Sequence, residues 1–505
     1  MNLQLYAPQV HLFAFHLFRT LESVPGSGVK NPDLLWEQCR GIFEKFHIKE
    51  QLELKPPHPE ECRYDLIKGN KPNDILLEIK PIITFDQKDL TLDGFVLPIQ
   101  FYDSYGFGLT IGYPEVQPEN LSRIPVADIS ILEEFNPDYC LLPEEIGSSL
   151  GQTLIITAWL SDEQKQAGEQ FWRKLADQCI KEFIPKGKRP SFSSQGQLFN
   201  SPIFEYENFN YTKNHYHILV CFWTDYASFK KFEDFYYEPI IELLYYRNKI
   251  IAEFRNSRYT YKYTRNEYQV IERLTTQTIK KLSPEDTLTE QDLQQLKQQL
   301  KKLIVQSVEY NNLLQDLGFR KNSIIIHTAN YQTKLQTLRN ELQAESESEP
   351  DLSFLETFAQ KNCLTFQEQI QADFGYFVQG SSLLEKAINS IRGIVAIDQA
   401  ERDRKREDRE KESDRQLQLT ICVASAGVTV GGIVASSSGQ ITEQNPIKWN
   451  VIKFHDHPIH PFTVLVFFSI VAGLVAGGIA WLIAWLLTKP CQSKKSHPNN
   501  QSSNN

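Results

Sequence analysis

Three histidines and an aspartate stand close together near the carboxyl end of the sequence, in residues 454–462, FHDHPIHPF. His455 and His457 alternate as on a strand and His460 follows a turn, so their imidazoles could reach one ion. Imidazole is a good ligand for zinc, copper or nickel. The stretch therefore predicts a metal site, and a divalent metal ion is the one candidate cofactor. The alternative is a proline-shaped loop whose histidines lie at a lipid interface.

A second cluster places basic residues between tyrosines, in residues 255–265, RNSRYTYKYTR. Arg258, Lys262 and Arg265 share one helix face, and such a pattern can hold nucleic acid or a nucleotide. The whole chain is acidic, however, with 53 Lys and Arg against 63 Asp and Glu and a formal net charge of −10. This charge argues against a surface that binds nucleic acid throughout. We expect a helix packed by its tyrosine rings, solvated basic side chains and no nucleic-acid partner.

Enzyme motifs are absent from the sequence, which has no P-loop, no HExxH, no CxxC pair and no GxSxG. Gly106, Gly108 and Gly112 are wrongly spaced for a dinucleotide loop. His215 and His217, in NHYHILV, are expected to flank a sheet and serve its structure. The 8 cysteines are scattered, as is typical of reduced thiols. We therefore expect no enzyme, and a membrane-tethered enzyme is the least favoured alternative.

Two long stretches near the carboxyl end carry no charge. They are residues 417–435, LQLTICVASAGVTVGGIVA, and residues 462–487, FTVLVFFSIVAGLVAGGIAWLIAWLL. At about 1.5 Å per residue, a helix of either length crosses most or all of a hydrocarbon layer about 30 Å thick. Lys and Arg gather before the first stretch and after the second, which places both termini in the cytoplasm. These patterns predict an integral membrane protein of the cell or inner membrane with a helical hairpin. The alternative for each stretch is a buried core helix.

A run of alternating charges, residues 401–415, ERDRKREDREKESDR, leads directly into the first uncharged stretch. Its opposite charges at helical spacing predict a solvated helix that continues into the span, and a disordered spacer is the alternative. Upstream, apolar residues step by four, three and four, which predicts the seam of a coiled coil in a long stalk helix. The seam residues are Leu384, Ile388, Ile391 and Val395.

Each predicted span also carries residues suited to assembly in lipid. Glycines at GxxxG spacing let helices pack closely. The helix-packing candidates are Gly427, Gly431, Gly473 and Gly477. Hydroxyl groups inside the first span could face a lumen and stand in for water around a cation. The pore-lining candidates are Thr420, Ser425 and Thr429. We therefore expect a homo-oligomer in the membrane.

The chain ahead of the charged run shows two patterns. Up to about residue 225, β-rich runs alternate with a few helices, and Ser161 with Gln164 predicts a capping box. Beyond it, helices are expected over about 239–281, 288–317, 322–343 and 352–373. The predicted fold class is an α/β (or α+β) cytosolic domain, a helical layer, a long stalk helix and a transmembrane hairpin. The expected divisions are 1–225 for the α/β domain, 226–343 for the helical layer, 344–350 for an acidic loop, 351–416 for the stalk, 417–435 and 462–487 for the spans, 436–461 for an outer loop and 488–505 for a polar, basic tail.

This order of parts resembles the CorA-type magnesium transporters. The resemblance covers nearly the whole chain, as topology, and it implies a pentamer whose first span lines a pore. The Gly-Met-Asn motif that follows the first span in that family is absent here. The corresponding stretch reads SSSGQ (436–440), and Met1 is the single methionine of the chain. No selectivity residue is therefore carried over.

Two functions follow from these expectations. The first is an oligomeric, CorA-like membrane protein that acts as an ion channel or transporter gated by its cytosolic domain. The alternative is a membrane-anchored sensor or scaffold whose cytosolic domain binds a protein or a small ligand. In that case the hairpin only anchors and oligomerises the chain.

Overall fold

The computed structural model describes residues 3–403, except residues 20–28, 30, 50, 69–74, 86–87, 114–123, 209–214, 282–288 and 346–350. Within these residues the chain forms two compact units. The sheet unit comprises Met1–Tyr259 and Phe319–Gln371. The helical unit comprises Thr260–Gly318 and the described chain from Ala372 onward. Both units are therefore built from two separate stretches of sequence.

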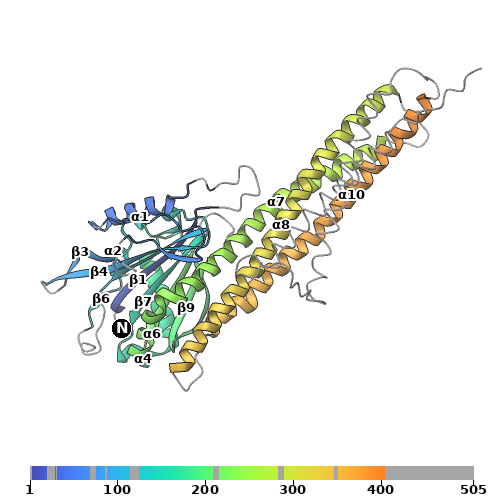
Figure 1. Cartoon of the computed structure of the whole chain (residues 1–505). Coiled ribbons are helices and arrows are strands. Elements are labelled where there is room, and N and C mark those ends of the chain that lie inside the picture. Colours follow the sequence, from blue (N-terminus) through green and yellow to red (C-terminus); the bar gives the residue numbers. More distant parts are fainter. Residues whose placement is uncertain are drawn as a thin grey trace, which may run out of the picture. The chain divides into compact units, whose positions relative to one another are not determined.

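The strands of the sheet unit pair into one mixed sheet of 10 strands (Figure 1). Their order is β2-β4-β5-β1-β7-β10-β9-β8, with β3 paired to β4 and β6 paired to β1. β7 and β10 are parallel, and the other described pairs are antiparallel. The sheet confirms the predicted α/β domain in its coarse form. The strands are β1 (Gln4–Leu17), β2 (Arg63–Asp65), β3 (Ile75–Phe85), β4 (Lys88–Phe101), β5 (Ser104–Gly112), β6 (Val126–Asp128), β7 (Gly151–Trp159), β8 (Ser191–Leu198), β9 (Ser201–Glu207) and β10 (His217–Trp223).

The central strands are buried on both faces. Every residue of β5 and of β10 is buried, which is typical of strands that helices cover from both sides. Gly112 serves close strand packing, because a Cβ at this position would lie 2.7 Å from the Cα of Gln9 on β1. The glycines of β5 thus belong to the packing of the sheet.

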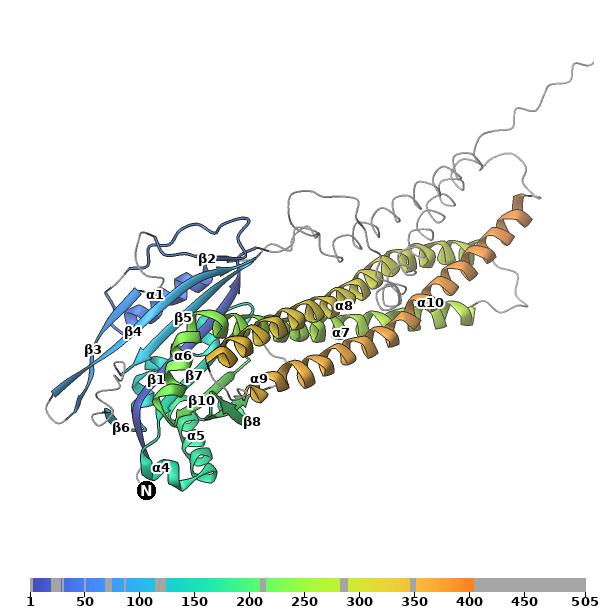
Figure 2. The same ribbon diagram turned by 60° about the horizontal axis from the view of Figure 1, so that its bottom comes forward.

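Helices cover the two faces of this sheet (Figures 1 and 2). On one face lie α6 (Tyr226–Phe235), η3 (Tyr236–Ile240) and the first part of α7 (Ile241–Lys281), where the Tyr245 ring stacks on Phe101 at 4.8 Å. On the other face lie α1 (Leu34–Lys45), whose Trp36 ring is 5.1 Å from Tyr105, and α5 (Glu169–Phe183). The remaining short helices here are α2 (Ile131–Glu134), η2 (Pro137–Tyr139), α3 (Pro143–Ile146) and α4 (Asp162–Ala167).

The predicted capping box is confirmed at the start of α4. The Ser161 hydroxyl accepts from the backbone N–H of Gln164, and the Gln164 side chain accepts from the backbone N–H of Ser161. Each bond satisfies a backbone donor that a helix N-terminus leaves open.

Three helices lie side by side in the helical unit: the second part of α7, the first part of α8 (Glu290–Glu345) and the second part of α10 (Cys363–Asp403) (Figures 1 and 2). Tyr310 of α8 donates to the carbonyl of Phe377 at 2.7 Å, and Tyr261 of α7 packs on the same residue. The buried residues of α8 alternate in steps of three and four, which is the spacing of a coiled-coil seam. Those that belong to the helical unit are Leu293, Leu296, Leu300, Leu303, Ser307, Tyr310, Leu314 and Leu317.

Two sequence predictions about these helices have opposite outcomes. The seam predicted from Leu384, Ile388, Ile391 and Val395 is confirmed, since all four side chains are buried on α10. The break predicted between residues 317 and 322 is wrong, because α8 continues through it. A single helical glycine such as Gly318 costs about 1 kcal/mol, which the burial of the seam outweighs. The chain then continues through α9 (Ser353–Thr357) and η4 (Phe358–Asn362) to α10.

The membrane predictions need correction. Among the described residues, which end at Asp403, no helix is both long enough and apolar enough to span a bilayer. The long helices α7, α8 and α10 each bury a seam and expose polar side chains elsewhere. For this part of the chain, the finding contradicts the predicted integral membrane protein, its channel or anchored-sensor function and its membrane location. The segments 417–435 and 462–487, from which those predictions came, lie outside the described residues.

The α8 seam makes a testable prediction about stability. Leu303→Ala removes a side chain that is 1% exposed and should lower the free energy of unfolding by about 2–5 kcal/mol. Val305→Ala, two residues along on the outer side and 60% exposed, should change it by less than about 0.5 kcal/mol. Urea unfolding followed by circular dichroism at 222 nm measures both variants, and equal effects would contradict the assigned seam.

Candidate functional site

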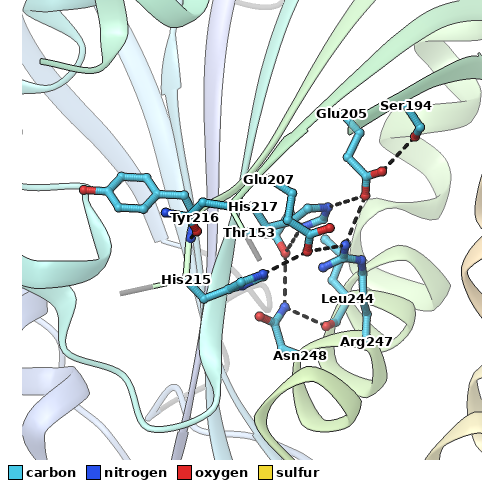
Figure 3. A network of polar contacts seen from close by, with 11 residues as sticks. Thr153, Ser194, Glu205, Glu207, His215, Tyr216, His217, Leu244, Arg247 and Asn248 are labelled. Carbon is cyan, nitrogen blue, oxygen red and sulfur yellow. Dashed lines mark hydrogen bonds and ion pairs between the residues drawn. The ribbon is translucent and has the colours of Figure 1, made fainter. Parts of the chain in front are cut away.

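A buried cluster of charged and polar side chains joins α7 to the sheet (Figure 3). α7 contributes a guanidinium and an amide, and the strands contribute two carboxylates, two imidazoles and a hydroxyl. All of these groups lie inside the sheet unit. The members are Arg247 and Asn248 of α7, Thr153 of β7, Glu205 and Glu207 of β9, His217 of β10 and His215 just before it.

Strand alternation brings the acidic and imidazole groups together. Glu205 and Glu207 are two residues apart on β9, so both side chains point to the same face of the sheet. In the antiparallel β9–β10 pair His217 stands opposite Glu207, which places its imidazole on that face as well. α7 covers this face, and its Arg247 meets the two carboxylates there.

Arg247 bridges the two carboxylates with one nitrogen atom. Its Nη2 lies 2.8 Å from Oε1 of Glu207 and 3.0 Å from Oε1 of Glu205. The Phe358 ring from η4 covers the guanidinium, with its centroid 4.8 Å away. Taking an ion out of water costs several kcal/mol, so these contacts are what make a buried arginine tolerable. His215 Nε2 lies 2.9 Å from the same Glu207 oxygen.

A chain of hydrogen bonds runs from a hydroxyl through an imidazole to a carboxylate. Thr153 Oγ1 lies 2.8 Å from Nδ1 of His217, and Nε2 of that imidazole lies 3.2 Å from Glu205 Oε1. Because an ionised carboxylate can only accept hydrogen bonds, Nε2 of His217 carries the proton. Nδ1 therefore accepts a hydrogen bond from the threonine hydroxyl. Asn248 Nδ2 donates to Thr153 Oγ1 at 3.1 Å and holds it in place. The order of groups is that of serine hydrolase triads.

The electrostatics of the cluster follow from burial and from Arg247. Burial lowers the pKa of His217 to about 4, and the charge of Arg247 acts in the same direction. Burial alone would raise the pKa of Glu205, but the hydrogen bond from His217 and the charge of Arg247 together lower it to about 2. For Glu207, Arg247 and His215 likewise outweigh burial, and its pKa is lowered. At neutral pH both carboxylates are therefore ionised beside a neutral His217.

The cluster is sealed from solvent. Thr153 is 0% exposed and His217 is 2% exposed. A catalytic nucleophile must touch its substrate, so the arrangement has triad order without a place for an external substrate. Among the described residues, no group of three or more His, Cys, Asp or Glu side chains is arranged to hold a metal ion. The geometry is that of a structural clamp between α7 and the sheet.

A small cavity of about 160 Å³ lies elsewhere in the sheet unit, lined by residues of β2 and β4 and by Tyr237. Arg63 of β2 borders it and is paired with Glu242 at 2.8 Å and Glu238 at 3.1 Å. Lys334 contacts the same two glutamates. Two cations thus meet two anions beside the cavity, and Asp65 on β2, an acidic residue, also lines it.

The basic and tyrosine-rich stretch predicted from the sequence lies on α7. Arg255 is partly buried and donates to the carbonyl of Ser149 at 2.8 Å. The expected inward packing of the tyrosines holds for Tyr261, which contacts Phe377, but not for Tyr263, which is 63% exposed. The stretch therefore presents an aromatic ring to solvent.

The other predicted site residues all fall outside the described residues, so the structure does not bring them together or separate them. They are the metal candidates His455, His457 and His460, the pore candidates Thr420, Ser425 and Thr429, and the helix-packing candidates Gly427, Gly431, Gly473 and Gly477.

The acidic and basic members of the buried cluster were not among the residues predicted from the sequence. A signal was present, because Glu205 and Glu207 alternate within the apolar run IFEYENF, and Arg247 interrupts the apolar start of α7. Charged residues in apolar runs are rarely buried without partners. His217 is the first residue of β10 and His215 lies just before it, and the two histidines complete the set of partners.

No family model matches the chain, and no curated protein matches it. The resemblance to CorA-type transporters stays a prediction.

Removing the bridging cation should destabilise the sheet unit strongly. Arg247→Ala leaves Glu205 and Glu207 buried without their shared partner, and we expect a loss of about 3–5 kcal/mol in the free energy of unfolding. Arg265→Ala, on an exposed part of the same helix, should cost less than about 0.5 kcal/mol. Urea unfolding of the two variants compares them. A small effect of Arg247→Ala would mean that the clamp is not essential.

The buried histidine predicts a pH dependence. The pKa of His217 is about 4 in the folded protein against an ordinary value of 6.5, so the unfolded chain binds a proton first as pH falls. The free energy of unfolding should fall between pH 6.5 and pH 4 by up to about 1.4 kcal/mol per pH unit from this group.

A substitution separates this effect from that of other groups. His217→Gln should flatten the slope between pH 6.5 and pH 4, whatever its effect on stability at pH 7. Glu205, with a pKa of about 2 against an ordinary value of 4.5, stabilises the fold above pH 4.5. This contribution is lost as pH falls from 4.5 to about 2, so it overlaps the window only between pH 4.5 and pH 4. Urea unfolding in steps of half a pH unit measures the slope, and identical slopes for variant and native chain would refute the assignment.

Proposed function

We propose that this protein is a non-catalytic scaffold that binds another protein through its helical unit. The observation that carries the proposal is a set of large apolar side chains left exposed although the seams of that unit are filled. They are Tyr263, Val305, Val308, Tyr376, Val378, Leu383 and Ile397. Single exposed apolar residues are ordinary on protein surfaces, but Tyr376, Leu383 and Ile397 recur on α10 at multiples of seven residues. Apolar residues that share one side of a helix mark interaction sites.

The degree of exposure supports this interpretation. Tyr376 is 57% exposed and Ile397 is 64% exposed, whereas Leu384 and Ile391 on the same helix are buried in the seam. Tyrosine is favoured at protein interfaces, because its ring combines a large apolar area with a polar tip and few rotatable bonds. The outer surface of the helical unit therefore offers the chemistry that a protein partner uses.

The buried cluster supports a scaffold rather than an enzyme. Its triad-like groups are buried away from solvent, and Arg247 donates hydrogen bonds to both carboxylates. We interpret the cluster as the clamp that fixes the start of α7 on the sheet.

Oxidative footprinting tests the scaffold proposal. Hydroxyl-radical labelling of Tyr263 and Tyr376, read by mass spectrometry, should be several-fold weaker for the chain in a gentle cell extract than for dilute purified protein. Tyr139, 38% exposed in the sheet unit, is the matched control and should be labelled equally in both. Equal labelling of all three tyrosines would refute the proposal.

A further inference from the structure

One face of α10 differs from an ordinary solvent-facing helix surface. The face consists of Gly375, Tyr376 and Gln379 and of the positions that follow each of them at intervals of seven residues, up to residue 400. Every one of these positions is exposed. Among these positions Lys386 is the one charged residue. The outer side of α8 is different, because Lys301, Lys302 and Glu309 are all exposed within three turns. Solvent-facing helix surfaces normally carry charges. This charge-poor face of α10 is therefore better suited to contact with another molecule than to contact with water.

The apolar residues of this face form a line. Tyr376, Leu383 and Ile397 are separated by seven and fourteen residues, with Ser390 at the missing step. At about 1.5 Å per residue, the line is roughly 30 Å long. A seven-residue repeat returns its members to nearly the same side of a helix every two turns, so the line can lie along a partner helix. The spacing therefore fits a second helix better than an extended peptide or a small molecule.

Charge selects among partner helices. A partner with a charged face would have to desolvate those charges against Leu383 and Ile397, where nothing compensates them. A charge-poor partner avoids this cost, and the same face on a second copy of the chain meets that requirement. Two copies bring together only one pair of like charges, from Lys386, and salt screens an exposed pair of this kind.

The line is also complementary to itself. Leu383 and Ile397 each lie seven residues from Ser390, so they are equally far from the midpoint of that segment. Leucine and isoleucine have nearly the same volume, and the small serine between them allows close approach. Ser390 meets its own counterpart whether the second helix runs parallel, in register, or antiparallel about this point. Self-complementarity of one patch is what a symmetric interface requires.

We infer that α10 associates with α10 of a second copy of this chain through Tyr376, Leu383, Ser390 and Ile397. The inference rests on the proposed scaffold function and names its partner as the same protein. The helical unit thereby joins copies of the chain through a helix-to-helix contact that is separate from its own filled seams.

Sedimentation of the purified full chain tests this inference. The native chain should form a dimer or higher oligomer at micromolar concentration and dissociate on dilution. Leu383→Lys with Ile397→Lys should weaken self-association at least tenfold. The control, Asn312→Lys with Gln315→Lys at exposed positions of α8, should leave it unchanged. Circular dichroism at 222 nm confirms that both variants keep their helices.

Cross-linking provides a second readout that does not depend on overall affinity. Ser390→Cys should form an intermolecular disulfide under mild oxidation well above the level of the native chain. Asn312→Cys, at an exposed position of α8, is the control and should not. A monomeric native chain would overturn the inference, as would equal cross-linking of the two cysteine variants or a lysine variant on α10 that associates like the native chain.

The two proposals fail in different ways. If the purified chain is monomeric while Tyr376 is still protected in cell extract, the partner is a different protein and only the self-association is refuted. If Tyr263 and Tyr376 are labelled equally in extract and in dilute protein, the scaffold proposal is refuted as well.

Discussion

The sheet unit depends on one guanidinium placed between two buried carboxylates. Arg247 reaches Glu205 and Glu207 with a single nitrogen, and the Phe358 ring covers the group. None of these ions would be stable alone in an apolar interior, so each one requires the others. This mutual requirement sets the position of α7 on β9 and fixes the rotation of the helix about its axis. A purely apolar contact would allow the helix to turn or slide by one residue at less cost.

The hydrogen-bonded chain of a threonine, a histidine and a glutamate has the groups of a catalytic triad but lies in a buried position. Thr153, His217 and Glu205 stand in the order that hydrolases use, and their distances are suitable. Catalysis also needs access for a substrate, and burial denies it here. The same low dielectric that makes the imidazole a poor proton acceptor strengthens its hydrogen bonds. Position in the fold therefore turns a reactive arrangement into a structural one.

Part of this architecture could be predicted from the sequence. Short β-rich runs, the Ser161 capping box and the α10 seam depend on local spacing, and local spacing is visible in a sequence. The buried cluster could not be assembled in the same way. Arg247 and Glu205 are 42 residues apart, and only strand pairing and helix docking bring them together. The continuity of α8 was missed for a related reason, because the tertiary burial of its seam outweighs a local glycine signal.

The sheet unit is not continuous in sequence, since it takes Met1–Tyr259 and then Phe319–Gln371. Phe358, which shields Arg247, belongs to the second stretch, as does Lys334, which neutralises Glu242 beside the Arg63 cavity. A polypeptide ending at residue 259 would contain every strand of the sheet yet expose its buried arginine to water. During synthesis, the ribosome must therefore add nearly a hundred further residues before Phe358 can cover Arg247 and complete the core of the sheet unit. No single cut or gene fusion point between the two units would separate an intact sheet from the helices.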